Sequence, residues 1–419
     1  MQINELKKKI DNLALGELYP DCALAKSRLC AVAEAHFRKF GEREELMLFS
    51  VPGRSEICGN HTDHNGGTVI AAAIDRDIIA AASPRSDGRI TVQSEGRRED
   101  ILTVEAATNP KNFPRFKSIS LIAGVVAGFI RAGYRVGGFD AYTATEVMSG
   151  SGLSSSAAFE VMIGNILNHL YNGGRIDNRE IAKIARFSEN VYFGKPCGLM
   201  DQMATAVGGF VYIDFGNEEP IVEHIDFSLT DAGYALAIVG TGGSHSDLND
   251  DFAQIPQEMK AVARALGKER MCEVLPSELY SALPKLRGRV SDRAILRAIH
   301  FLSECDRVGK MHAALLSGDM PEILAIHRES GHSSFEYLQN VFTTKHKDQG
   351  LSVAIAMSDR YLRPYAASVR VHGGGFEGTV QALVPLEIKD GYREYMDATF
   401  GRGACMLLGV RSRGAVRIM

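Results

Sequence analysis

Residues 147–158 read Val-Met-Ser-Gly-Ser-Gly-Leu-Ser-Ser-Ser-Ala-Ala, and the interpretation of the whole chain depends on this stretch. Its two glycines allow positive φ angles and a close approach of the backbone to a bulky anion. The residues that follow are rich in Ala, Met, Glu and Ile and predict a helix, which a preceding serine is placed to cap. Loop amides and the positive end of a helix together form a phosphate site. A capped helix after an ordinary turn has the same signature, so other motifs must decide.

The composition is that of a globular protein. The 419 residues are 45% hydrophobic and 23% charged, with a net charge of −4, which gives no indication of a nucleic-acid partner. Neither an apolar signal core nor a run of about 18 apolar residues occurs, so we expect a cytoplasmic protein with no membrane partner. The seven cysteines are scattered and form no Cys-x-x-Cys pair, which argues against disulfides and structural zinc. A monomer is the default expectation.

Hydrophobic periodicity predicts a mixture of helices and strands. Residues 5–40 are expected to be helical, and residues 45–51 to form a strand that ends at Pro52-Gly53. Asp87-Gly88 indicates a hairpin between short strands. Further helices are expected at 119–132, 157–172, 178–193, 252–267, 291–308, 310–317, 320–330 and 349–358, and further strands at 208–215, 234–240, 367–371 and 379–384. A change of composition at 216–220 predicts a boundary between two domains, residues 1–215 and 216–419.

Two loops besides the glycine-serine stretch have the composition of ligand sites. Residues 54–67 contain nine polar residues in fourteen positions, with Arg, Asn, His and Asp side chains suited to a polyol. Residues 194–202 place two glycines and a proline around Asp201, so the turn is expected to present a fixed carboxylate. Residues 373–378 formally match a dinucleotide fingerprint, but a strand pattern follows them where that fingerprint requires a helix.

Taken together, these loops describe a small-molecule kinase. Phosphoryl transfer needs neutralisation of phosphate charge and in-line positioning more than it needs covalent chemistry. The glycine-serine loop can hold phosphates, an acidic residue can hold Mg²⁺, Asp201 is held on a fixed turn, and the loop at 54–67 can bind a sugar. No P-loop motif is present, so a P-loop nucleotide enzyme is excluded.

The chain resembles the GHMP-superfamily sugar kinases, and among them the galactokinases. The similarity lies in five motifs that occur in family order across residues 52–384. They are Pro-Gly-Arg at 52–54 with Gly-Asn-His-Thr-Asp-His-Asn at 59–65, Gly-Ser-Gly-Leu-Ser-Ser-Ser-Ala-Ala at 150–158, Glu189-Asn190 with the turn at 194–202, Ser-Gly-His-Ser at 330–333, and Gly-Gly-Gly-Phe-Glu-Gly at 373–378. The first motif is specific to the galactokinase branch.

The resemblance implies an α+β protein with a two-lobed GHMP kinase fold. Its N-terminal domain would be of the ribosomal-protein-S5-domain-2-like type and its C-terminal domain ferredoxin-like, with the active site in the cleft between them. The implied activity is direct transfer of the γ-phosphate of Mg-ATP to the anomeric hydroxyl of a hexose, with galactose expected to give galactose 1-phosphate.

Residue roles carry over by position. Asp201 is the implied base near the anomeric hydroxyl, and Arg54 would steady the developing charge. Ser155, with Ser154 or Ser156 close by, and Glu189 would hold Mg²⁺. Because an aspartate of ordinary pKa is a weak base at pH 7, it serves best as a late proton acceptor. The implied substrate-binding residues are Asn60, His61, Asp63, Gly198 and Phe252. The implied ATP-binding residues are Gly150, Ser151, Gly152, Leu153, Ser154, Ser155 and Ser156.

Two departures from the galactokinase pattern leave the substrate open. Galactokinases usually carry Glu, which receives the C6 hydroxyl of the sugar, where Asn60 stands, and Tyr where Phe252 aligns. Loss of that carboxylate removes a repulsion against a substrate with its own carboxylate at C6, and the galacturonate kinases share Asp-His at 63–64. Galacturonate or another galactose-like sugar is therefore an alternative substrate, and a non-catalytic sugar sensor on the same fold is a third hypothesis.

Overall fold

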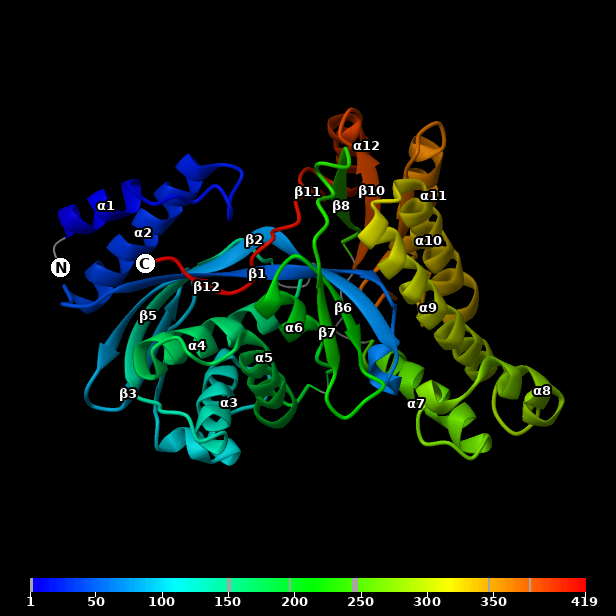
Figure 1. The fold of residues 1–419 in the computed structure, drawn as a ribbon, viewed down its shortest axis with the longest axis horizontal. Coiled ribbons are helices and arrows are strands. Elements are labelled where there is room, and N and C mark those ends of the chain that lie inside the picture. Colours follow the sequence, from blue (N-terminus) through cyan, green and yellow to red (C-terminus); the bar gives the residue numbers. More distant parts are fainter. Residues whose placement is uncertain (1–2, 149–151, 196, 243–247, 346, 377) are drawn as a thin grey trace.

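The computed structural model describes residues 3–148, 152–195, 197–242, 248–345, 347–376 and 378–419, which form two lobes around two β-sheets (Figure 1). The strands of the larger sheet are β1 (Met47–Cys58), β2 (Thr68–Arg85), β3 (Arg89–Ser94), β4 (Asp100–Thr103), β5 (Gly138–Thr145), β6 (Phe210–Asp214), β7 (Ile221–Ile225) and β12 (Val416–Arg417). Six of them lie in the order β12-β1-β2-β5-β3-β4, while β6 pairs with β2 and with β7.

The sheet corrects two expectations about turns. Strand β1 does not end at Pro52-Gly53 but continues to Cys58, with a shift in its register against β2 between Pro52 and Arg54. A bulge tolerates proline because it interrupts the hydrogen-bond ladder. The Asp87-Gly88 turn does join β2 to β3, but these strands do not pair, because β5 lies between them and pairs with both. The predicted hairpin is therefore wrong.

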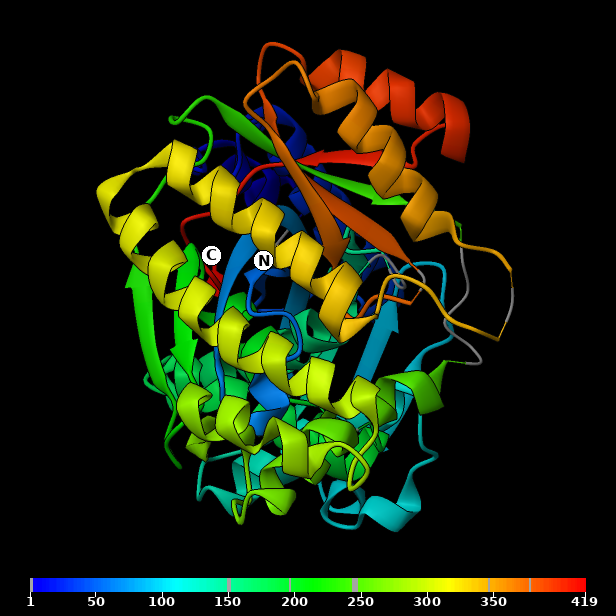
Figure 2. The same ribbon diagram turned by 90° about the vertical axis from the view of Figure 1, so that its right-hand side faces the viewer.

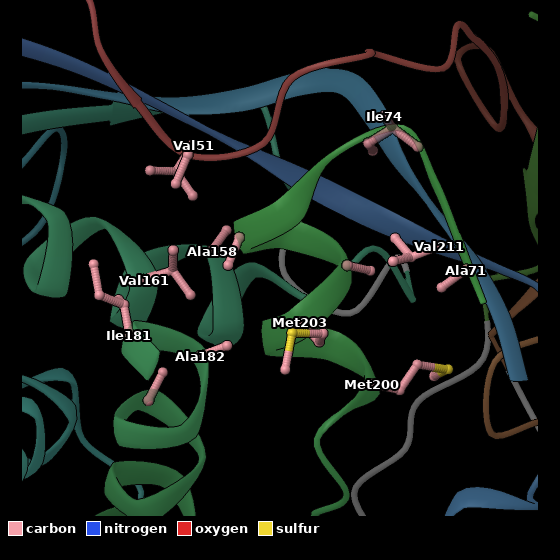
Figure 3. Close-up of a cluster of buried hydrophobic side chains, with 14 of the residues drawn as sticks. Val51, Ala71, Ile74, Ala158, Val161, Ile181, Ala182, Met200, Met203 and Val211 are labelled. Atoms are coloured by element: carbon pink, nitrogen blue, oxygen red, sulfur yellow. The ribbon is translucent and has the colours of Figure 1, made fainter. Parts of the chain in front are cut away.

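Helices cover both faces of the larger sheet. Helices α1 (Ile3–Asp11) and α2 (Cys22–Phe40) lie on one face, so the expected helical region of residues 5–40 is interrupted between them. On the other face lie α3 (Ser118–Arg131), α4 (Ser155–Asn172), α5 (Asn178–Phe187) and α6 (Met200–Val207) (Figure 1). Figure 3 shows the core between these helices and the sheet, where Val161 of α4 and Met203 of α6 point into one apolar layer with Val51 and Val211.

The second lobe is built on a four-stranded antiparallel sheet. Its strands are β8 (Tyr234–Gly240), β9 (Ser368–His372), β10 (Thr379–Pro385) and β11 (Cys405–Leu408), in the order β11-β8-β10-β9. Its helices are α7 (Asn249–Ala265), α8 (Pro276–Leu286), α9 (Asp292–Ser317), α10 (Met320–Ser333), α11 (Gly350–Leu362) and α12 (Lys389–Phe400). The long helices α9 and α10 run antiparallel across the front of the molecule in Figure 2. The strand predicted after the glycine loop at 373–378 is confirmed as β10.

The expected domain boundary at 216–220 falls between two strands of the larger sheet, since β6 and β7 pair with each other. The chain also returns to that sheet at its far end, where β12 pairs with β1. The division into residues 1–215 and 216–419 therefore stays a prediction. None of the helices in the described part of the chain is long and apolar enough to span a membrane.

Asp77, a fully buried residue of β2, joins three distant segments of the larger lobe. Its carboxylate accepts hydrogen bonds from Tyr19 and Ser50, and it pairs with Arg28 of α2 at 2.8 Å and with Arg411 near the end of the chain at 3.5 Å. Arg28 also pairs with Glu146 at 3.1 Å, whereas the buried Arg411 has Asp77 as its carboxylate partner among the described residues and depends on it for charge compensation.

Replacing Asp77 by Ala should therefore destabilise the protein by about 3–5 kcal/mol, because it leaves buried positive charge without its partner. Urea denaturation followed by circular dichroism measures the change. Glu5→Gln is the control, since Glu5 forms an exposed pair with Lys9 one helical turn away and its loss should cost about 0.5 kcal/mol or less. An equal effect of the two variants would contradict the role of Asp77.

Candidate active site

Arg54 and Asp201 form a two-point ion pair at the centre of the candidate site. The Nε and Nη2 atoms of Arg54 donate to Oδ1 and Oδ2 of Asp201, each at 2.7 Å. Ser154 donates to Oδ2 of the same carboxylate at 2.6 Å. Since a carboxylate has about four acceptor positions, this arrangement leaves one lone pair on Oδ1 for another donor. The structure thus brings together the two residues predicted to be catalytic.

Local backbone features aim these side chains at each other. Arg54 follows the bulge of β1, which re-aims the strand, and its own N–H donates to the carbonyl of Leu153 at 3.1 Å. Gly53 permits this approach, because a Cβ there would lie 2.9 Å from that carbonyl. Asp201 lies in the first turn of α6. The site is therefore built where β1, the glycine-serine loop and α6 meet.

The electrostatics of the pair keep Asp201 ionised. Burial by itself raises the pKa of Asp201, but the charge of Arg54 and the hydrogen bonds from Arg54 and Ser154 lower it to about 2. A carboxylate with so low a pKa is a poor base at neutral pH. Any proton that it accepts must therefore move late, after the donor has become strongly acidic.

The glycine-serine loop departs from the expected capping geometry. Ser154 occupies the N-cap position of α4 but has a left-handed φ of 58° in place of the extended backbone of a usual N-cap, and its side chain makes no cap. Its hydroxyl donates to Asp201. The side chain of Ser154 therefore does not cap the first amides of α4, which lie at the positive end of the helix, where an anion is favoured. Gly152 packs against His372, and its carbonyl accepts from Arg54. Gly150 and Ser151, also predicted to bind ATP, lie outside the described residues.

Glu189 is the buried acidic residue beside this loop. It lies in a π-helical turn, Ser188–Phe193, and is 1% exposed. Its carboxylate accepts from Ser156 at 3.0 Å and from Gln202 at 2.7 Å, and Lys195 lies 3.4 Å away. Ser156, one of the serines expected beside the metal, thus contacts Glu189.

These groups fit a magnesium ion. Mg²⁺ is usually held by one or two carboxylates together with phosphate oxygens, rather than by a cage of protein ligands. Glu189 with a serine hydroxyl at the start of α4 is such a partial site. The described ranges contain no group of three or more His, Cys, Asp or Glu residues arranged for a metal.

The sugar loop after β1 lies against the turn that precedes Asp201. Gly198 is in such close contact with the Asp63 carboxylate that a Cβ at position 198 would overlap it. His61 adopts a left-handed φ of 60° and donates from Nε2 to the carbonyl of Gly374 at 2.9 Å. Burial lowers the pKa of His61 to about 3, so the ring is neutral at pH 7. Asp63, Gly198 and His61 are thus brought to one region.

Phe252 and Asn60 contact the glycine loop that follows β9. The ring of Phe252 packs against Gly374 and lies edge-to-face with Phe376, at 5.3 Å between ring centres. Asn60 is fully buried, and its amide nitrogen donates to the carbonyl of Gly373 at 2.7 Å. The oxygen and the nitrogen of its amide both have protein partners, so the side chain of Asn60 points from the sugar loop into the protein interior rather than to solvent.

Helix α9 holds the backbone of the sugar loop from both sides. Glu304 accepts from the N–H groups of Gly59 and Asn60 at 3.0 and 3.3 Å, while His300 donates from Nε2 to the carbonyl of Asn60 at 2.9 Å. Burial alone would raise the pKa of Glu304, but His300, Arg307 and neighbouring positive charge lower it. A fixed negative charge therefore anchors two loop amides.

Sequence reasoning missed most of this supporting layer. The missed residues are Glu56, Gln202, His300, Glu304, Asn340, Arg370 and His372. The position of Gln202 near the site could have been predicted, because Gln202 directly follows Asp201 in the turn at 194–202. Glu56 lies only four positions from Asn60, within the polar loop at 54–67, but its other partner, Arg370, is 314 positions away. The remaining five lie 240 to 320 positions from the groups that they bind in this loop, and no local pattern distinguishes them from ordinary helix or strand residues.

Comparison with known proteins agrees with this geometry. The profile of the galactokinase galactose-binding signature matches residues 34–84, and that of the GHMP kinases N terminal domain matches residues 120–209. A galactokinase from Streptomyces coelicolor is 30% identical over 394 residues, which cover 91% of this chain and 97% of that protein. The chain belongs to the galactokinase family.

A second sequence relative and two solved structures are also similar to this galactokinase-family protein. Human galactokinase is 30% identical over 402 residues, or 93% of this chain and 96% of the human protein. Lactococcus lactis galactokinase complexed with galactose is similar with a TM-score of 0.80 at 21% identity, covering 93% of this chain and all of that one. A mevalonate kinase gives a TM-score of 0.62 at 15% identity. The expected two-lobed α+β GHMP kinase fold is confirmed.

The low pKa of Asp201 predicts a pH dependence of stability. The pKa is lowered from 3.8 to about 2 on folding, so the ionised carboxylate stabilises the folded state fully above about pH 5, and this contribution is lost as the pH falls towards 2. The stability difference between the wild type and Asp201→Asn should shrink by about 2 kcal/mol between pH 6 and pH 2. Urea denaturation across this range measures it, and a constant difference would contradict the pairing.

Proposed function

We propose that this protein is an ATP-dependent galactokinase, which transfers the γ-phosphate of Mg-ATP directly to the anomeric hydroxyl of galactose to give galactose 1-phosphate. The observation that carries the proposal is the Arg54–Asp201 pair beside the start of α4, in a chain that aligns over 91% of its length with a galactokinase. Phosphoryl transfer requires positioning and charge stabilisation, and this arrangement supplies both.

Asp201 is the proposed proton acceptor. The lone pair that Arg54 and Ser154 leave on Oδ1 can receive a hydrogen bond from the anomeric hydroxyl, which orients that oxygen towards the phosphate. As the oxygen–phosphorus bond forms, the hydroxyl becomes acidic enough to pass its proton to a carboxylate of low pKa. Arg54 steadies the charge that develops and keeps the carboxylate in one orientation.

Phosphate and metal binding are assigned to the loop and the start of α4. The first amides of α4, with the predicted loop residues 150–156, would hold the phosphates of ATP. Glu189 would hold Mg²⁺ together with Ser155, and the contact between Ser156 and Glu189 makes Ser156 a second hydroxyl candidate. When bound, Mg²⁺ supplies neutralisation of the phosphate charge.

The proposed sugar contacts are Asp63, His61, Gly198 and Phe252, whereas the amide of Asn60, the fifth residue predicted to bind the sugar, is engaged by protein partners. Asp63 carries acceptor oxygens suited to ring hydroxyls, and Phe252 offers an apolar ring without a hydroxyl. Because Asn60 is neutral, galacturonate is the second candidate substrate, since no carboxylate at that position would repel it. The monomeric state and the cytoplasmic location remain predictions.

The first experiment is ADP release from Mg-ATP against galactose, galacturonate, glucose, N-acetylgalactosamine and arabinose. Strong turnover of galactose is the expected result and would mean that Asn60 and Phe252 are tolerated variations. Preference for galacturonate, or for a sugar without the C6 hydroxyl, would replace the proposed substrate. Stabilisation by ATP and sugar without any ADP formation would instead indicate a sugar sensor.

Replacing Asp201 by Asn should abolish turnover while the protein stays folded and binds ATP. The amide cannot accept the proton, and loss of general-base function lowers kcat by a factor of about 10²–10⁴. Single-turnover assays measure the rate, and binding of a fluorescent ATP analogue serves as the control. Turnover close to that of the wild type would remove Asp201 from the base role.

A further inference from the structure

A buried polar cluster lies directly behind the sugar loop and is not explained by catalysis. We define the Glu56–Asn60 cluster as the side chains of Glu56, Asn60, Asn340 and Arg370 with the carbonyl of Gly373. Glu56 is 4% exposed, and Asn60 and Asn340 are both 0% exposed. Segments from both lobes meet here, since Glu56 belongs to β1 and Arg370 to β9.

The contacts fix the orientation of the Asn60 amide. Its nitrogen faces acceptors only, namely the two carboxylate oxygens of Glu56 at 3.1 and 3.3 Å and the carbonyl of Gly373 at 2.7 Å. Its oxygen faces donors, namely Asn340 at 2.8 Å and Ser334 at 3.4 Å. Both N–H groups and both lone pairs are therefore engaged, and no hydrogen-bonding capacity remains for a sugar hydroxyl.

A carboxylate at position 60 would be badly accommodated while Glu56 is present. It would place an oxygen where the amide nitrogen now donates, opposite the carboxylate of Glu56 and a backbone carbonyl. Like charges buried this close disfavour each other strongly, and unpaired buried charge is costly. The neighbouring Glu304 adds a third acid to the region.

The positive charges nearby are already committed. Arg370 pairs with Glu56 at 2.7 Å and also donates to the carbonyl of Ile57, while Arg307 pairs with Glu304 at 2.7 Å. Arg54 is engaged with Asp201. Each of these three arginines thus already pairs with one carboxylate, so a new carboxylate at position 60 would add negative charge to the region without adding positive charge.

We propose that Glu56 is a specificity-determining residue of this protein, because it fixes the amide of Asn60 and so withholds position 60 from the sugar. Glu56 and Asn60 then act as one coupled pair, and the chemistry that position 60 presents to the substrate changes only when both residues change. The selectivity part of this inference rests on the proposed function, whereas the coupling of the two side chains does not.

A double-mutant cycle of Asn60→Glu, Glu56→Gln and the double variant E56Q/N60E tests the proposal. Asn60→Glu alone should lower the melting temperature by at least about 5 °C and reduce kcat/KM for all sugars without changing their ratio. In the double variant, the amide at position 56 can donate to the new carboxylate, so the melting temperature should recover above that of Asn60→Glu.

The double variant should also favour galactose over galacturonate about tenfold more than the wild type does, because a carboxylate accepts from a hydroxyl and repels an acid. The preference is measured both as kcat/KM and as stabilisation of the protein by each sugar in the presence of ATP. The second readout works without turnover, so an inactive wild type would refute the proposed function and leave the coupling measurable.

Asp140→Asn is the matched control, alone and combined with Asn60→Glu. Asp140 is a buried carboxylate, 1% exposed, paired with Arg43 and Arg85 in the larger lobe and without contact to the sugar loop. Its effect should add to that of Asn60→Glu. The proposal would be overturned if Asn60→Glu and the double variant shifted the sugar preference equally, or if neither shifted it. It would also be overturned if the effects of Glu56→Gln and Asn60→Glu on the melting temperature were additive.

Discussion

The site depends on the hydrogen bonds and the ion pair by which the second lobe holds the end of β1 and the two residues that follow it. Glu304 and His300 hold the peptide groups of Gly59 and Asn60, and Arg370 holds Glu56 and the carbonyl of Ile57. Each of these bonds joins groups more than 200 positions apart in the chain. Because Arg54 leads into this segment and Asp63 follows it, the same bonds determine where the ion pair and the sugar loop lie relative to each other.

Each of the three buried carboxylates around the site binds a different kind of partner. Asp201 is paired with Arg54 near the proposed point of transfer, Glu304 anchors backbone amides, and Glu56 orients a neighbouring amide. Low dielectric makes such groups costly unless every lone pair is used. The result is a rigid layer behind the site, which suits a reaction that relies on fixed positions rather than on covalent intermediates.

The sequence predicted where helices and strands occur better than it predicted which strands pair with each other. Periodicity and capping signals located α3, α4, α5 and β10, since those signals are local. The insertion of β5 between β2 and β3 could not be predicted, because a period of two identifies a strand but not its partner. The motifs located Arg54 and Asp201, but the left-handed φ that turns Ser154 away from capping and towards Asp201 follows from packing alone. The partners of Asn60 were missed for the same reason.

The junction at Asp77 has a consequence for synthesis on the ribosome. Asp77 and Arg411 are separated by 334 positions, and the edge of β1 is completed only by β12. At about 5–20 residues per second, roughly 15 to 70 s pass between the emergence of the acid and that of its last cation. During that interval the nascent sheet has an open edge and an incompletely neutralised interior, a state in which chaperone binding would protect it.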